Sequence, residues 1–216
     1  MKTNVYIDGF NLFNGCLKGS PYKWLDLARL CQTLFPTHQI NQIRYFTAAV
    51  IAFPHKPDAP TNQDFYLRAL ATLPSITVHR EGWFASHPIT LPEYPLTFPQ
   101  GRADPPKLVR VLKMEEKRTD VDIATHLLVD CFDNDFDQAV VISNDSDLAS
   151  PIAVVRTKFG KHVVVVNPHR RWKMSKHLVQ AASSQVRKIN PSVLRACQFA
   201  PSLSDSVGTF TKPPTW

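Results

Sequence analysis

The 216-residue sequence has only four cysteines and no long apolar run, and these two shortages exclude several classes of protein. The cysteines lie far apart and form no CxxC pair, which argues against a zinc knuckle or a disulfide-rich scaffold. No apolar stretch approaches the roughly 18 residues that a membrane helix needs. Asp8 interrupts the only early apolar stretch, which argues against a secretory signal. We therefore expect a reduced, cytosolic protein without a membrane segment.

Acidic residues are scarce in the last third of the chain. Residues 156–216 hold eleven Lys and Arg against one acid, whereas residues 119–155 hold eight aspartates and no Lys or Arg. A basic segment is either a solvated surface or a binding surface for a polyanion, because clustered cations release condensed counterions from a phosphate backbone. The acids beside it also suggest a third interpretation, a metal site that acts on phosphates.

Short β-branched runs alternate with amphipathic segments, which favours an α/β fold with a mainly parallel, doubly wound sheet of about five strands. Six prolines between residues 85 and 106 predict a loop, such as a lid or a substrate rim. Residues 1–190 are expected to form this domain, and residues 191–216 a docked or frayed tail. We expect strands at 4–7, 42–51, 75–84, 108–114, 139–142 and 163–166, and helices at 24–34, 62–72, 120–132, 148–159 and 175–189.

Carboxylates follow several of the predicted strands, at positions that meet at one edge of a parallel sheet. Acids held close together repel one another unless a cation neutralises them. Oxygen ligands suit Mg²⁺ or Mn²⁺, which keep waters and bind phosphates. The sequence therefore predicts a metal site at this edge. The acids that follow strands are Asp8, Asp120, Asp122, Asp145 and Asp147.

Most of these acids also have a structural interpretation. Asp120 and Asp147 each precede or open a predicted helix and could serve as its N-cap. Asp8 lacks this alternative, because no helix is expected for it to cap. Asp122 and the acids between residues 130 and 137 are better interpreted as a solvated face and loop, and His126 as a side chain that touches solvent.

Three stretches resemble the NYN domains of the PIN-like nuclease superfamily, namely YIDGFNLF, EEKRTDVDIATHLLVD and VVISNDSDLASPIAVVRTKFGKHVVVVNP. They follow the family's order and spacing, and with the elements between them they cover about residues 3 to 190. The resemblance implies a three-layer PIN-like (Rossmannoid) fold and metal-dependent cleavage of RNA. The family's acidic set falls on Asp8, Asp120, Asp145 and Asp147, with Asn11 and Ser143 as polar neighbours.

The implied chemistry assigns roles to these residues. Mg²⁺ or Mn²⁺ held by the acids would polarise the scissile phosphate and activate a water. Lys117 and Arg118 would stabilise the negative charge that develops on the phosphoryl oxygens. A basic segment would bind the RNA backbone while an indole within it stacks a base, although the indole has core packing as its alternative. This segment consists of Arg170, Arg171, Trp172, Lys173 and Lys176.

The sequence departs from the usual family pattern at three positions. The common glycine after the lysine is Arg118, the usual SGD is Ser143-Asn144-Asp145, and a common acid in the middle helix is His126. The ISNDSDLA variant resembles a branch in which some members are named hydroxysuccinoylpyridine hydroxylase. An NADH-dependent monooxygenase acting on a pyridine of the 6-hydroxy-3-succinoylpyridine type is therefore an alternative, although no GxGxxG follows a strand. A non-catalytic RNA-binding module is another. The oligomeric state stays open, a homodimer included.

Overall fold

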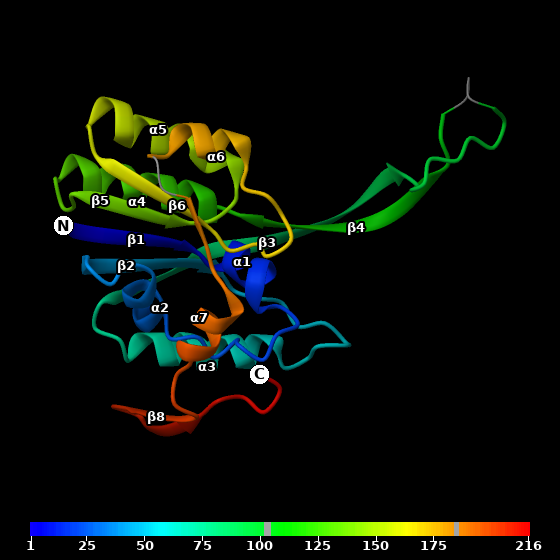
Figure 1. Cartoon of the computed structure of the whole chain (residues 1–216). Coiled ribbons are helices and arrows are strands. Elements are labelled where there is room, and N and C mark those ends of the chain that lie inside the picture. The colour runs from blue at the N-terminus through cyan, green and yellow to red at the C-terminus, as the bar shows by residue number, and fades with distance from the viewer. Residues whose placement is uncertain (102–104, 184–185) are drawn as a thin grey trace.

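The computed structural model describes residues 1–101, 105–183 and 186–216. Within these residues seven strands form one sheet in the order β4-β3-β2-β1-β5-β6-β7, with helices on both faces (Figure 1). Neighbouring strands run parallel, except that β3 and β4 run antiparallel. The expected α/β three-layer fold is thus confirmed. The strands are β1 Lys2–Asp8, β2 Gln39–Ala48, β3 Ile76–Pro92, β4 Leu108–Lys117, β5 Gln138–Ile142, β6 His162–Asn167 and β7 Val186–Lys188.

The helices form two layers, with α2, α3 and α7 on one side of the sheet and α4, α5 and α6 on the other (Figure 1). Each layer closes its own apolar core against the sheet. The central strands β5 and β6 are buried on both faces, which explains their continuous apolar runs. No helix of the described residues is long and apolar enough to cross a membrane. The helices are α1 Gly9–Leu12, α2 Leu27–Leu34, α3 Ala59–Ala71, α4 Thr119–Phe132, α5 Ala149–Lys158, α6 Lys176–Ala181 and α7 Pro191–Ala196.

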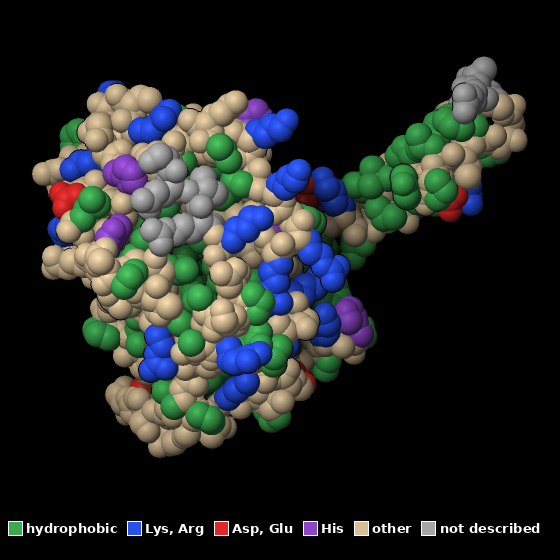
Figure 2. Space-filling view, viewed as in Figure 1, with side chains coloured by type: hydrophobic (Ala, Val, Ile, Leu, Met, Phe, Trp, Pro, Cys, Tyr) green, Lys and Arg blue, Asp and Glu red, His purple; other side chains and the backbone are tan. Residues whose placement is uncertain are grey.

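The predicted loop at 85–106 is wrong in its first part, because β3 continues to Pro92 and pairs with β4. β2 pairs with β3 only as far as Gly82. Beyond Gly82, β3 and β4 pair only with each other and form a two-stranded ribbon. We call this ribbon the arm; it projects away from the body and carries many apolar side chains (Figures 1 and 2). Both strands of a ribbon are edge strands, where a proline need not remove a ladder hydrogen bond. The prolines therefore did not exclude a strand. Residues 102–104 of this prediction lie outside the described residues.

The last predicted helix, at 175–189, is also wrong in its second half. α6 ends at Ala181, and β7 adds a parallel strand beside β6. Residues 184 and 185 lie outside the described part of the chain. The misassignment follows from the polar, short β7, which lacks the apolar run that marks the central strands.

Residues after Pro191 pack against the body on the side of α2 and α3. They form α7 and a hairpin of β8 (Ser202–Asp205) and β9 (Gly208–Thr211). The Trp24 ring packs on the rings of Phe199 and Trp216, at centroid distances of 5.8 and 6.4 Å. Arg68 and Asp205 form a bidentate ion pair. The tail is therefore docked.

Candidate active site

The centre of the sheet is a switch point between β1 and β5. From β1 the chain continues towards β2 on one side, whereas β5 and β6 extend the sheet on the other. Side chains that follow these two strands therefore meet at one crevice outside their carboxyl ends. Ser143, which follows β5, donates a hydrogen bond of 2.9 Å to Oδ2 of Asp8, the last residue of β1. The Asp145 amide donates to the same hydroxyl at 3.0 Å.

Asp8 caps a helix, contrary to the expectation that it has none to cap. Its Oδ1 accepts the Asn11 amide at 2.8 Å, at the start of α1. α1 has four residues and continues as a π-helical turn at Phe13–Leu17, which is too short for the apolar periodicity that marks a helix in sequence. Both oxygens of Asp8 are thus held in place, and its side chain is buried, with 5% exposed. The carboxylate has a fixed orientation and still has free lone pairs.

Asn11 connects this crevice to the loop after β6. Its Oδ1 accepts the Asn144 amide at 3.0 Å and lies 3.0 Å from Nε2 of His169. The His169 ring stacks on Trp172, with centroids 4.5 Å apart and planes at 14°. Trp172 is 65% exposed, so the alternative that it packs in the core is wrong. His169 was not foreseen, because nothing in the sequence pairs a single histidine with a distant asparagine.

A cleft of about 960 Å³ opens over these residues. We call it the acidic cleft, because four carboxylates from three parts of the chain line it. Cations, one indole and several uncharged side chains also line it, so acidic and basic groups share the cleft. The acids are Asp8, Glu116, Asp120 and Asp145, the cations are Lys18, Arg170 and Arg171, and the indole is that of Trp172.

The carboxylates in the acidic cleft disturb one another. Burial, and then the charges of Asp145, Asp8 and other neighbouring acids, raise the pKa of Asp120 to about 7. Burial raises the pKa of Asp8 to about 6, against the hydrogen bonds from Asn11 and Ser143, which lower it. The charges of Asp145 and Glu116 contribute to this raised pKa. A proton or another cation would relieve this crowding.

The donor set fits a hard divalent cation in its chemistry, since all four acids offer oxygen. Among the described residues, however, no three His, Cys, Asp or Glu side chains lie at metal-ligand spacing. An ion held here would therefore rely on one or two carboxylates and keep several waters. This is the manner in which Mg²⁺ usually binds.

Asp147 lies outside the acidic cleft, unlike the other three acids of the expected set. It is exposed, its amide donates to Oδ1 of Asp145 at 3.0 Å, and its charge adds to the raised pKa of Asp120. Neither expected cap is formed, because the N-caps of α4 and α5 are Arg118 and Leu148. Asp120 lies instead in the first turn of α4.

Most of the remaining predicted cations also lie away from the acidic cleft. Lys117 pairs with Glu115, and Arg118 with Asp122. Both side chains are exposed and neither lines the cleft. Lys173 and Lys176 are likewise exposed and do not line it, although the Lys173 carbonyl accepts a hydrogen bond from Asn144. Of the basic segment, Arg170, Arg171 and Trp172 reach the cleft.

Glu116 was not foreseen as a cleft residue, because the strand before it was expected to end at Met114. β4 runs on to Lys117, which carries Glu116 to the cleft. Both the backbone amide and the hydroxyl of Thr119 donate to its Oε1. The acidic pair before α4 is visible in the sequence, but the predicted end of the strand was wrong.

The solvated-face interpretation of residues 130–137 is wrong for Asp130. This side chain is buried and accepts hydrogen bonds of 2.8 Å from the Tyr6 hydroxyl and from two nitrogens of Arg44. It ties α4 to β1 and β2. His126 packs against the rings of Phe46 and His79.

Comparisons with known proteins agree with this architecture. A 6-hydroxy-3-succinoylpyridine 3-monooxygenase, HspA of Pseudomonas putida (strain DSM 28022 / S16), is 30% identical over 240 residues, which cover 100% of this chain and 75% of that protein. A crystal structure of a protein of unknown function from Vibrio parahaemolyticus RIMD 2210633 shares the fold. Its TM-score is 0.55 at 14% identity, over 88% of this chain and 93% of that one. The NYN domain model matches residues 2–190, and the chain belongs to the NYN domain family.

Proposed function

We propose that this NYN domain is a metal-dependent ribonuclease that hydrolyses RNA phosphodiester bonds in the acidic cleft. The observation that carries the proposal is the meeting of four carboxylates at the switch point, beside two arginines and an exposed indole. A cleft lined by both acids and arginines suits a cation on its carboxylates and a phosphate backbone on its arginines.

In this proposal the carboxylates have two roles, to bind a cation and to orient the attacking water. Asp8 and Asp145 would hold Mg²⁺ or Mn²⁺, with Asp147 near enough to add charge. Such an ion, when bound, supplies Lewis acidity towards a phosphate oxygen and makes a water more acidic. Asp120 would hold the ion or orient the attacking water. The hydrogen bonds that fix Asp8 reduce the rearrangement needed as charge develops.

The RNA would lie along the loop after β6. Arg170 is already oriented, because its guanidinium donates to the Cys16 carbonyl at 3.0 Å. Arg171 is exposed and free to bind a phosphate. Trp172 rests on His169 with most of its surface exposed, as a base-stacking side chain would. Lys and Arg side chains also gather on the body near the base of the arm (Figure 2).

The test is cleavage of a labelled single-stranded RNA with Mg²⁺, Mn²⁺ or EDTA. Asp145→Asn keeps the volume and removes a charge, so we expect a loss of cleavage of about 100-fold or more, with RNA binding by anisotropy largely kept. Asp133→Asn is the matched control, because Asp133 is an exposed aspartate outside the cleft. Full cleavage by Asp145→Asn, once contaminating nucleases are excluded, would contradict the proposed catalytic site. RNA binding that survives EDTA, without cleavage in any arm, would identify a non-catalytic RNA-binding module instead.

A second candidate is an NADH-dependent monooxygenase that hydroxylates a substituted pyridine. The observation that favours it is the 30% identity, across the whole of this chain, to a protein named as such an enzyme. The sequence offers no GxGxxG turn for the dinucleotide. NADH oxidation that requires 6-hydroxy-3-succinoylpyridine, alongside RNA that stays intact, would favour this candidate over the ribonuclease.

A further inference from the structure

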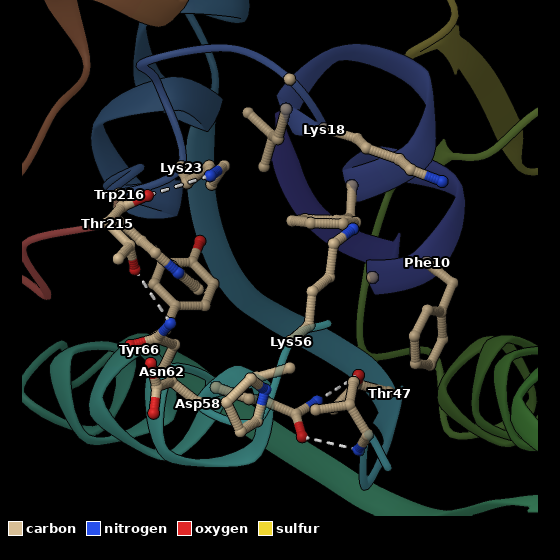
Figure 3. Close-up of a pocket in the computed structure, with 18 of the residues that line it drawn as sticks. Phe10, Lys18, Lys23, Thr47, Lys56, Asp58, Asn62, Tyr66, Thr215 and Trp216 are labelled. Carbon is tan, nitrogen blue, oxygen red and sulfur yellow. Dashed lines mark hydrogen bonds between the residues drawn. The ribbon is translucent and has the colours of Figure 1, made fainter. Parts of the chain in front are cut away.

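A second pocket, of about 450 Å³, shares a wall with the acidic cleft (Figure 3). The shared wall is α1 with its π-helical turn, since Phe10, Lys18 and Gly19 line both cavities. Phe13 lines only the second pocket, whereas Asn11 lines only the cleft. The remaining walls come from β2, the segment before α3, α3 itself and residues 215–216.

Aromatic rings and unpaired lysines distinguish this cavity, which we call the aromatic pocket. Three lysines line it against one acid, Asp58. Within the described residues, Lys18 and Lys56 have no ion-pair partner, so their charges are available to a ligand. The rings are Phe10, Phe13, Tyr45, Tyr66 and Trp216, and the lysines are Lys18, Lys23 and Lys56.

The aromatic wall is held in place. The Tyr66 hydroxyl donates to the Leu25 carbonyl at 2.9 Å, and its ring lies 6.2 Å from Tyr45 and 5.5 Å from Trp216. Thr215, the residue before Trp216, is held as well, because Asn62 donates to its hydroxyl at 3.1 Å and Lys23 to its carbonyl at 3.3 Å. A flat ligand would therefore meet a preformed surface.

The polar side chains of the aromatic pocket leave little besides charge for recognition. Gln63 uses both ends of its amide within the protein, on Thr47, on the Ala48 carbonyl and on the Val50 amide. Lys56, by contrast, is an exposed side chain that reaches across the pocket, with Tyr66 on one side of it and Phe10 on the other (Figure 3). The aromatic rings and the Lys56 ammonium together indicate the chemical class of ligand that the pocket can bind.

We propose that the aromatic pocket binds a small planar aromatic anion, with its ring on the Tyr66 and Trp216 side and its carboxylate or phosphate on Lys56. Rings favour offset or edge contacts with such a ligand, and an ammonium forms a charge-assisted hydrogen bond with its anionic group. The inference does not depend on the ribonuclease activity, because the acidic cleft contributes no carboxylate to this pocket.

The test is isothermal titration of the whole chain with four probes that separate ring from charge. Nicotinate has both features, nicotinamide has the ring without the charge, and cyclohexanecarboxylate has the charge without an aromatic ring. AMP carries a purine and a phosphate, and therefore distinguishes a nucleotide source from an aromatic carboxylate. We expect nicotinate or AMP to bind more tightly than the two single-feature probes.

Two variants locate the binding. Lys56→Met keeps the length of the side chain and should raise the dissociation constant of the anion by about 10- to 100-fold, the usual effect of losing a hydrogen bond to a charged group. Lys158→Met, an exposed lysine at the end of α5, should leave the dissociation constant unchanged. Circular dichroism of both variants checks their folding. The proposal is overturned if neither nicotinate nor AMP binds, if cyclohexanecarboxylate binds as well as they do, or if Lys56→Met binds like the wild type.

Discussion

The acidic cleft and the aromatic pocket have one wall in common and opposite chemistry. The cleft gathers carboxylates from strand ends and the first turn of α4. The pocket gathers rings from α1, β2, α3 and the C-terminal segment, and lysines from the segments before α2 and α3. The segment after β1 presents Asn11 of α1 to the cleft and Phe13 of the π-helical turn to the pocket. The difference shows that one short segment after β1 can border two cavities with different linings. The following predictions test whether the two cavities depend on each other.

The largest effect should follow from a change in the shared wall. A Cβ at Gly9 would lie 2.7 Å from the Phe46 carbonyl oxygen and 2.7 Å from the Tyr45 ring, and the backbone atom cannot yield. We expect Gly9→Ala to lower the free energy of unfolding by about 3 kcal/mol, as overpacking does, and to weaken ligand binding in both cavities. Urea denaturation measures the first effect.

Gly19→Ala is the contrast for this substitution. Gly19 has φ of +70° and nothing within 4 Å of an added Cβ, so only the backbone conformation is strained. The expected cost is about 1 kcal/mol. Equal losses in the two variants would mean that close packing at Gly9 is not what shapes the shared wall.

Much of this arrangement could be predicted from sequence, because parallel strands deliver the residues that follow them to one edge. For Asp120 the reason is different, because the antiparallel β4 returns from the arm and ends at this edge. The parallel-strand rule itself correctly predicts that Asp8 and Asp145 meet. It failed for Asp147, which is turned out by the 3₁₀ turn at Ser146–Leu148, and for Glu116, which depends on where β4 ends. Tertiary packing decides both where a strand ends and how a side chain is oriented within a turn.

The aromatic pocket and the arm could not be predicted in the same way. The pocket needs residues as distant as Phe10, Lys56 and Trp216 to meet, and no periodic pattern records such a meeting. The prolines of the arm led to the prediction of a loop, because a central strand excludes proline. An edge strand tolerates proline, and both strands of the arm are edge strands. Tertiary contacts, more than local propensity, decided both features.

Divalent cations should stabilise the protein through the acidic cleft alone. At 100 times the dissociation constant, Mg²⁺ should add about 2.7 kcal/mol to the free energy of unfolding by mass action. Asp145→Asn should show a much smaller gain, and Lys56→Met the full gain, because Lys56 lies in the other cavity. Thermal melts with and without Mg²⁺ measure this. A full gain in Asp145→Asn would mean that Asp145 is not a ligand.

The crowded carboxylates should make stability depend on pH when no cation is present. Asp120 has a pKa raised from 3.8 to about 7, so the native state binds more protons than the unfolded state between about pH 4 and pH 7. Stability should therefore fall as pH rises through this window, and the penalty is complete above pH 7. In EDTA, we expect Asp120→Asn to melt higher than the wild type at pH 8 and similarly at pH 4.

Asp122→Asn provides the control, since Asp122 shares the first turn of α4 and pairs with Arg118. It loses the same favourable interaction with the helix dipole. It should not melt higher at pH 8. If Asp120→Asn gives no advantage that grows with pH, the carboxylates do not repel one another as inferred.

A smaller effect should follow from loss of the exposed indole. Trp172→Ala should weaken single-stranded RNA binding by about 5- to 100-fold, the range for one stacked base. It should leave nicotinate binding unchanged, because Trp172 does not line the aromatic pocket. Anisotropy and calorimetry on the same preparation measure both. Weakened nicotinate binding would show that the two cavities are coupled.

The smallest effect concerns the salt dependence of RNA binding, and it separates two neighbouring cations. Arg171 lines the acidic cleft, whereas Lys173 does not, although both are exposed. Each phosphate contact with a single strand contributes about 0.7 to the slope of log K against log salt concentration, through the counterions that it releases. Arg171→Ala should therefore reduce the slope by about 0.7, and Lys173→Ala should leave it unchanged. Anisotropy titrations between about 50 and 300 mM salt resolve this difference, because the Debye length shortens over this range. An equal reduction in both variants would extend the RNA path beyond the cleft towards α6, and no reduction in either would make the whole basic segment a solvated surface.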